Sequence, residues 1–245
     1  MPLVVGLLGD QRFFILAVSR AEVKSKAFAK NLKRIIARIE NARLSYSSHQ
    51  IIKLIAVSKY HTSSDIECMY EAGQRAFGEN KVQDLKSKTT DLATLPIEWH
   101  FVGTLQSNKI NTLLSLKPSL VHSVDSLALA LALDKKCQTR GMVQDILLQV
   151  NASKEDSKHG FALESISDIY AQITHTCANL RLKGIMTIGA NVDDKRQIAK
   201  CFEQTKKAFD TLQGAEILSM GMSGDFELAI QNGANMVRIG SALFE

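Results

Sequence analysis

Three positions in the chain place chemically useful side chains directly after apolar runs. Lys59 closes the run Leu54–Ser58, Ser223 lies in the glycine-rich stretch Gly221–Asp225, and Arg238 precedes Gly240 and Ser241. A desolvated lysine amine can form a Schiff base with a carbonyl group. Small residues before a helix expose backbone N–H groups, which together with a hydroxyl can bind an anion.

Each of these features also has a purely structural interpretation. A lysine after a strand commonly extends its ammonium group into solvent, and the spacing around Lys59 does not decide between the two. The glycines around Ser223 and Ser241 can simply form tight turns. The elements that carry these residues are therefore needed to interpret them.

Short apolar runs alternate with helical patterns along most of the chain. The alternation indicates parallel strands, each followed by a crossover helix. No glycine-rich phosphate turn follows the first run, where an open doubly wound sheet usually carries one. We therefore predict an α/β fold, a single (β/α)₈ TIM-type barrel with an additional N-terminal helix at Ala21–Ser47. The predicted strands are Lys53–Ser58, Arg75–Gly78, Glu98–Gly103, Leu120–Ser123, Asp145–Val150, Leu182–Ile188, Glu216–Met220 and Met236–Ile239. Ser63 or Ser64, before Ile66, and Asp193, before Ile198, are the expected caps of two of the helices.

The barrel prediction brings the three positions together, because barrel sites are built at the carboxyl ends of the strands. Lys59 would follow the first strand, and the two glycine-serine loops would follow the seventh and eighth. Loops there often bind phosphate. A lysine facing a phosphate cradle is what a pyridoxal phosphate site requires, and Arg238 would be able to meet the pyridine nitrogen.

Composition limits the other possibilities. The chain has 245 residues and a net charge of +5, which suggests an anionic ligand without indicating nucleic-acid binding. Four cysteines lie far apart, so we expect neither a metal site nor a disulfide framework. Residues 1–20 are predicted to be an extension outside the barrel, which occupies residues 21–245. We expect no transmembrane segment, a cytoplasmic location and a monomer.

Several stretches also match a known family, in its order along the chain: Ala56–Lys59, Phe77–Asn80, Trp99–Lys109, His122–Asp125, Gln149–Asn151, Lys158–Gly160, Leu182–Met186, Leu218–Asp225 and Val237–Ser241. With these stretches the chain resembles the pyridoxal phosphate homeostasis protein family, the single-barrel relatives of the alanine racemase N-terminal domain. It departs from the family's common residues at Lys81, Tyr60–His61 and Gly189–Ala190, on the rim of the expected pocket.

The resemblance implies a protein that holds pyridoxal 5'-phosphate as an internal aldimine on Lys59. It further implies that Ser223, Gly240 and Ser241 bind the phosphate, that Arg238 faces the ring nitrogen, and that Asn80 and Met222 line the ring. Its implied role is to buffer the cofactor or supply it to apo-enzymes, without established catalysis.

Two alternatives remain at this level. An amino-acid racemase needs a second acid/base group opposite Lys59, and in alanine racemase that group comes from a second domain. A phosphate-sugar barrel enzyme would need paired carboxylates at the strand ends, for which Asp125 and Glu155 are the candidates.

Overall fold

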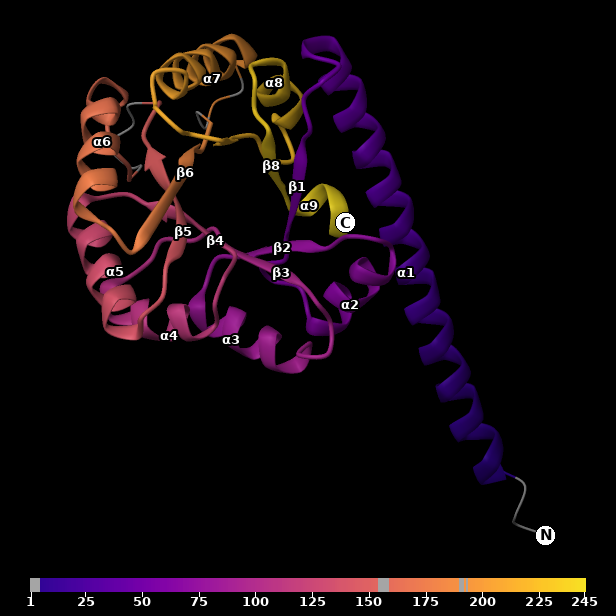
Figure 1. Ribbon diagram of the computed structural model, residues 1–245. Helices are drawn as coiled ribbons and strands as arrows, with labels where there is room; N and C mark the ends of the chain where they lie inside the picture. Colours follow the sequence, from indigo (N-terminus) through magenta and orange to yellow (C-terminus); the bar gives the residue numbers. More distant parts are fainter. Residues whose placement is uncertain (1–4, 154–158, 190–191, 193) are drawn as a thin grey trace.

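The chain folds as a closed barrel of parallel strands surrounded by helices (Figure 1), as seen in a computed structural model. The structure describes residues 5–153, 159–189, 192 and 194–245, with side chains from residue 22 onward. The barrel strands, each hydrogen-bonded to the next, are β1 (Lys53–Val57), β2 (Ala76–Glu79), β3 (Glu98–Phe101), β4 (Leu120–Val124), β5 (Gln144–Val150), β6 (Leu180–Thr187), β7 (Ile217–Ser219) and β8 (Met236–Ile239). Strand β8 pairs with β1 and closes the barrel. The predicted fold class is confirmed, and every predicted strand is present within a few residues of its expected bounds.

The helical elements follow the strands in the order that the sequence predicts. They are α1 (Val5–Tyr46), α2 (Ser63–Glu71), α3 (Val82–Asp91), the 3₁₀ turn η1 (Ser107–Lys109), α4 (Ile110–Ser115), α5 (Leu127–Arg140), the 3₁₀ turn η2 (Leu163–Ser165), α6 (Ile166–Thr176), α7 (Lys195–Phe209), α8 (Phe226–Gln231) and α9 (Ser241–Phe244). No helix in the described part of the chain is long and apolar enough to span a membrane.

Two helix starts differ from those expected. Helix α2 is capped by Thr62 rather than by Ser63 or Ser64: the Thr62 hydroxyl accepts from the backbone N–H of Asp65, and the Asp65 carboxylate accepts in return from the backbone N–H of Thr62. Helix α7 is capped by Asp194, whereas the expected cap Asp193 lies outside the described residues. Both differences arise because adjacent polar residues are equally good caps on sequence alone.

The helices bury one face against the outside of the barrel, and a smaller apolar layer fills part of its interior. That inner layer consists of Ile55, Ala76, Leu120, Leu147, Met186 and Met236. Apart from Met186, which lies near the carboxyl end of β6, these residues lie near the amino ends of their strands or at mid-strand. The carboxyl-end half of the interior is correspondingly available for polar side chains.

Helix α1 is longer than predicted, because it begins at Val5 instead of Ala21. Its carboxyl-terminal half packs on α2, α8 and α9, and its amino-terminal half extends beyond the barrel (Figure 1). Arg38 fixes it to α8 by a two-pronged ion pair, with Nε and Nη2 lying 2.9 and 2.8 Å from the Glu227 carboxylate oxygens. The boundary that we place between residues 20 and 21 stays a prediction.

Candidate functional site

A cavity of about 840 Å³ opens at the carboxyl ends of the strands. The residues predicted as its lining from the sequence are all found there: Lys59, Asn80, Met222, Ser223, Arg238, Gly240 and Ser241. Asp125 is absent from the lining, and Glu155 lies outside the described residues. The structure thus places the predicted residues around one space, while their roles as ligands stay predictions.

Lys59 lies in a tight turn that directly follows β1. The backbone N–H of His61 donates to the carbonyl of Ser58 at 3.0 Å, and Tyr60 adopts a φ of 69°, a left-handed conformation that costs a non-glycine residue energy. The Lys59 side chain is exposed instead of partly desolvated as expected, and its Nζ lies 5.5 Å from the centre of the Tyr60 ring. The turn therefore presents the amine to the open cavity.

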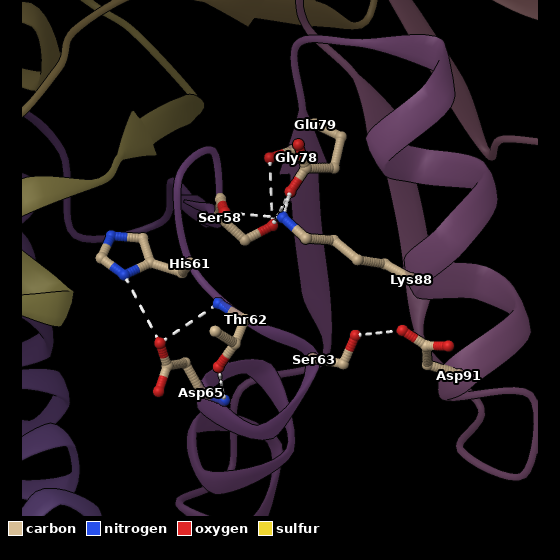
Figure 2. Close-up of polar contacts among 9 residues, drawn as sticks. All are labelled: Ser58, His61, Thr62, Ser63, Asp65, Gly78, Glu79, Lys88 and Asp91. Atoms are coloured by element: carbon tan, nitrogen blue, oxygen red, sulfur yellow. Dashed lines mark hydrogen bonds and ion pairs between the residues drawn. The ribbon is translucent and has the colours of Figure 1, made fainter.

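A buried polar cluster packs against this turn (Figure 2). The Glu79 carboxylate, fully buried at the end of β2, accepts from Ser58 Oγ at 2.7 Å and forms an ion pair with Lys88 of α3. Lys88 Nζ also donates to the Ser58 carbonyl at 2.9 Å. The cluster was not predicted from the sequence, although Glu79 belongs to a stretch that matches the family; nothing in the sequence marks Lys88.

Asn80 extends from the end of β2 into the cavity. Its Oδ1 is buried and accepts no hydrogen bond from any residue that the structure describes. Gly103, at the end of β3, passes so close that a Cβ there would lie 1.9 Å from the Asn80 carbonyl oxygen. The backbone at position 103 must therefore be glycine if Asn80 is to keep this place, and Asn80, which lines the cavity, keeps an acceptor that no described residue satisfies.

The loops after β7 and β8 form the part of the cavity wall next to the Lys59 turn, because β8 pairs with β1. Gly221 has a φ of 95°, which glycine adopts without strain, and the backbone N–H of Met222 donates to Asp225 Oδ1 at 2.6 Å. Ser223 Oγ accepts from the backbone N–H of Ala242 at 3.5 Å, which joins the two loops. Burial raises the pKa of Asp225, while the bond from Met222 and the charge of Arg238 act against that rise.

Arg238 is the most deeply buried charged group of the lining. Its side chain is 5% exposed; Nη1 donates to Ser219 Oγ at 2.7 Å and Nη2 to the Thr187 carbonyl at 2.8 Å. Burial lowers the pKa of Arg238 to about 10, and the guanidinium is still charged at neutral pH. Both hydrogen bonds hold the guanidinium between β6, β7 and β8.

Comparison with known proteins places this barrel in a class. Residues 23–245 match the alanine racemase N-terminal domain. Alanine racemase from Corynebacterium glutamicum superimposes with a TM-score of 0.68 at 14% identity, over 89% of this chain and 60% of that one, which shows a shared fold. The chain is thus a barrel of the alanine racemase N-terminal type.

Relatives of higher identity narrow the class. Pyridoxal phosphate homeostasis proteins from Helicobacter pylori (strain 26695) and Aquifex aeolicus are 54% and 35% identical, covering 89% and 87% of this chain and 98% and 95% of their own lengths. PipY of Synechococcus elongatus, solved with pyridoxal phosphate bound, is 31% identical with a TM-score of 0.77, over 89% of this chain and 100% of that one. The chain belongs to the pyridoxal phosphate homeostasis protein family.

Proposed function

We propose that this protein binds pyridoxal 5'-phosphate at the carboxyl-end cavity and acts in intracellular cofactor homeostasis. The single observation that carries the proposal is the gathering of Lys59, Arg238 and the Ser223 loop around one space. The names of the relatives and the cofactor bound to PipY support the same role. We further propose that the protein is a cytoplasmic monomer that buffers the cofactor or supplies it to apo-enzymes.

The residues present fit this group chemically. The cavity volume lies within the usual range of small-ligand sites, about 300–1,000 Å³. The cavity wall carries an exposed primary amine on Lys59 and, beside it, glycine and serine loops with backbone donors. On the other side of Lys59, after β2, the free Oδ1 of Asn80 is a buried acceptor that a ligand donor would satisfy.

When bound, the cofactor supplies a reactive aldehyde, an aromatic ring and a phosphate dianion. Lys59 Nζ would bond to the aldehyde carbon, and Ser223, Gly240 and Ser241 would donate to the phosphate. Asn80 and Met222 would flank the ring. The turn at Tyr60 and the Glu79–Lys88 cluster would fix the backbone from which the Lys59 side chain extends.

The proposal includes no catalysis. Arg238 has donors only, so at the ring nitrogen it would keep that atom unprotonated and make the ring a poor electron sink. Racemisation further requires a second acid/base group on the far side of the substrate carbon. The racemase alternative is for these reasons not favoured, and prolonged incubation with L-alanine should give no turnover in the usual enzymatic range of about 1–10³ per second.

The test is reduction of the loaded protein with borohydride, followed by peptide mass spectrometry. We expect a yellow protein whose colour is lost on reduction, with the cofactor attached to the peptide that contains Lys59. Lys59→Ala should take up no covalent cofactor, whereas the matched variant Lys81→Ala, which removes another exposed lysine of the same cavity, should still do so. An adduct on Lys81, or a colourless wild type, would contradict the proposal.

A further inference from the structure

A chain of buried polar side chains crosses the barrel interior from the cofactor site to the opposite mouth. Arg238 Nη1 lies 2.7 Å from Ser219 Oγ, and Ser219 Oγ lies 3.3 Å from His122 Nδ1. His122 Nε2 then lies 2.9 Å from His100 Nδ1, and His100 Nε2 lies 3.0 Å from Glu98 Oε1. The two histidines and Ser219 are 1% exposed or less. The proposed function uses only the Arg238 end of this chain.

The opposite end reaches a second cavity, of about 280 Å³, at the amino ends of the strands. Glu98, His100 and Lys53 line it, and the Glu98 carboxylate accepts from Lys53 Nζ. Glu98 retains 35% of its side-chain exposure, so this end of the chain contacts solvent. The polar chain thus links a solvent-exposed carboxylate to the buried guanidinium of the main site.

The hydrogen bonds between Arg238 and Glu98 can be donated in only one direction, toward Glu98. The hydrogen bond from His100, with the help of Lys53, lowers the pKa of Glu98 to about 2, so the carboxylate is ionised and only accepts. His100 Nε2 must therefore carry a proton.

Burial lowers the pKa of His100 and, more strongly, that of His122, so both rings are neutral. A neutral ring has one donor and one acceptor nitrogen. His100 Nδ1 consequently accepts from His122 Nε2, and His122 Nδ1 accepts the hydroxyl proton of Ser219. Ser219 then offers Arg238 lone pairs alone.

This direction also matches the charges at the two ends. Every hydrogen points toward Glu98, so the negative end of each bond dipole points toward Arg238. Aligned hydrogen bonds polarise one another, which strengthens each of them. The charged groups that face the histidines, from β1, β3 and β8, are Lys53, Glu98 and Arg238.

We propose that His122 and His100 are positioning residues, which hold Arg238 in place through Ser219 with Glu98 as its remote counter-charge. Ser219 can act as a pure acceptor for the guanidinium only while its own proton is committed to His122. Without the acceptor at Glu98, the proton of His100 is no longer fixed on Nε2. The protons of His122 and Ser219 then lose their fixed positions in turn. The consequence for cofactor binding rests on the proposed function, whereas the direction of the chain does not.

The test reads the histidine tautomers by ¹⁵N NMR in the protein without added cofactor. In the wild type at pH 7 we expect both rings to be neutral, with the proton on Nε2. Glu98→Leu removes the acceptor and should populate the Nδ1–H form of His122, two hydrogen bonds away. Glu98→Gln retains a carbonyl acceptor and should keep the wild-type tautomer. The control is Glu216→Leu. It removes a carboxylate that pairs with Lys183 at the same mouth of the barrel but takes no part in the hydrogen bonds between Glu98 and Arg238, so it should change the tautomer of neither histidine.

The second measurement is the dissociation constant of pyridoxal phosphate for the same proteins. Glu98→Leu should weaken binding about tenfold, Glu98→Gln less, and Glu216→Leu not at all. Melting temperatures confirm that the variants are folded, and a merely structural role for Glu98 would change them without changing the His122 tautomer. A proton on His122 Nδ1 in the wild type, or an unchanged tautomer in Glu98→Leu, would overturn the direction. Unchanged affinity in Glu98→Leu would overturn the positioning role. A wild type with the expected tautomers but no cofactor binding would contradict the proposed function alone.

Discussion

At the residue scale, Ser223 is the side chain that joins the two glycine-serine loops. Its Oγ accepts from the backbone N–H of Ala242, and it lines the same cavity as Lys59. The hydroxyl is therefore already oriented by the loop that follows β8. A substitution here changes the charge of the anion site without removing any buried apolar group.

Ser223→Asp should weaken retention of pyridoxal phosphate strongly, because it sets a carboxylate against the phosphate. Ser223→Ala should do less harm, since it removes a single hydrogen bond to a charged group, worth about 1.5–3 kcal/mol. Equilibrium dialysis of the cofactor against the three proteins measures the order. Equal retention would mean that the phosphate lies elsewhere.

Glu79 and Lys88 form a buried ion pair next to the turn that carries Lys59, and Lys88 also donates to the carbonyl of the preceding residue, Ser58. Lys88→Met leaves the Glu79 carboxylate buried without its cation, and removal of one partner of such a pair costs about 3–5 kcal/mol. The double variant Glu79→Leu/Lys88→Met removes both charges and should recover part of that loss. Urea unfolding measures the free energies, and a double variant less stable than Lys88→Met would contradict this interpretation.

At the scale of elements, α1 does more than extend the barrel. Phe28, 2% exposed, packs edge-on against Phe244 of α9 with ring centres 5.4 Å apart. Phe244 in turn stacks on His61 in the turn after Lys59, at 4.2 Å between ring centres. Helices α1 and α9 therefore support the Lys59 turn from outside.

Phe28→Ala should lower the free energy of unfolding by about 3–5 kcal/mol, the usual cost of emptying a buried phenylalanine site. The control Val23→Ala changes a residue of the same helix that is 68% exposed, and should change stability by less than about 0.5 kcal/mol. Thermal unfolding of the three proteins provides the comparison. If Phe28→Ala lost no more stability than Val23→Ala, the Phe28 contact would not be what holds α1 on the barrel.

At the scale of the whole molecule, the interior histidines predict how stability depends on pH. Burial lowers the folded-state pKa of His100 and His122 below 6.5, and that of half-buried His61 as well. Below about pH 6.5 the unfolded chain therefore binds more protons than the folded one, and the free energy of unfolding must fall as pH falls.

Between pH 7 and 5 we expect His122, whose pKa is lowered most, to contribute the largest part of this loss, at most about 1.4 kcal/mol per pH unit once the pH is below the unfolded pKa. His122→Gln should flatten this dependence. The carboxylates with lowered pKa are Asp65, Glu98, Glu203 and Glu227, and they lose their contribution only below about pH 4.5, so the interval separates the two effects. Denaturant unfolding at several pH values checks the slope, and an equal slope in His122→Gln would contradict the assignment.

The sequence alone determined the barrel and the edge at which its site is built. Apolar runs of strand length alternating with helical patterns define parallel strands, and strand ends in a barrel share one mouth. The order of these elements is therefore enough to group Lys59, Ser223 and Arg238, and all three line one cavity.

Only the tertiary structure decided which polar groups support that site. Within a strand the alternation of side chains fixes which residues share a face, but it does not say which face points inward or what lies across the barrel. Ser219 meets His122 across 97 residues of chain, and Lys88 meets Glu79 through a helix turned toward the sheet. Such contacts depend on barrel closure and strand register, which bring buried donors and acceptors within hydrogen-bonding distance irrespective of their separation in sequence.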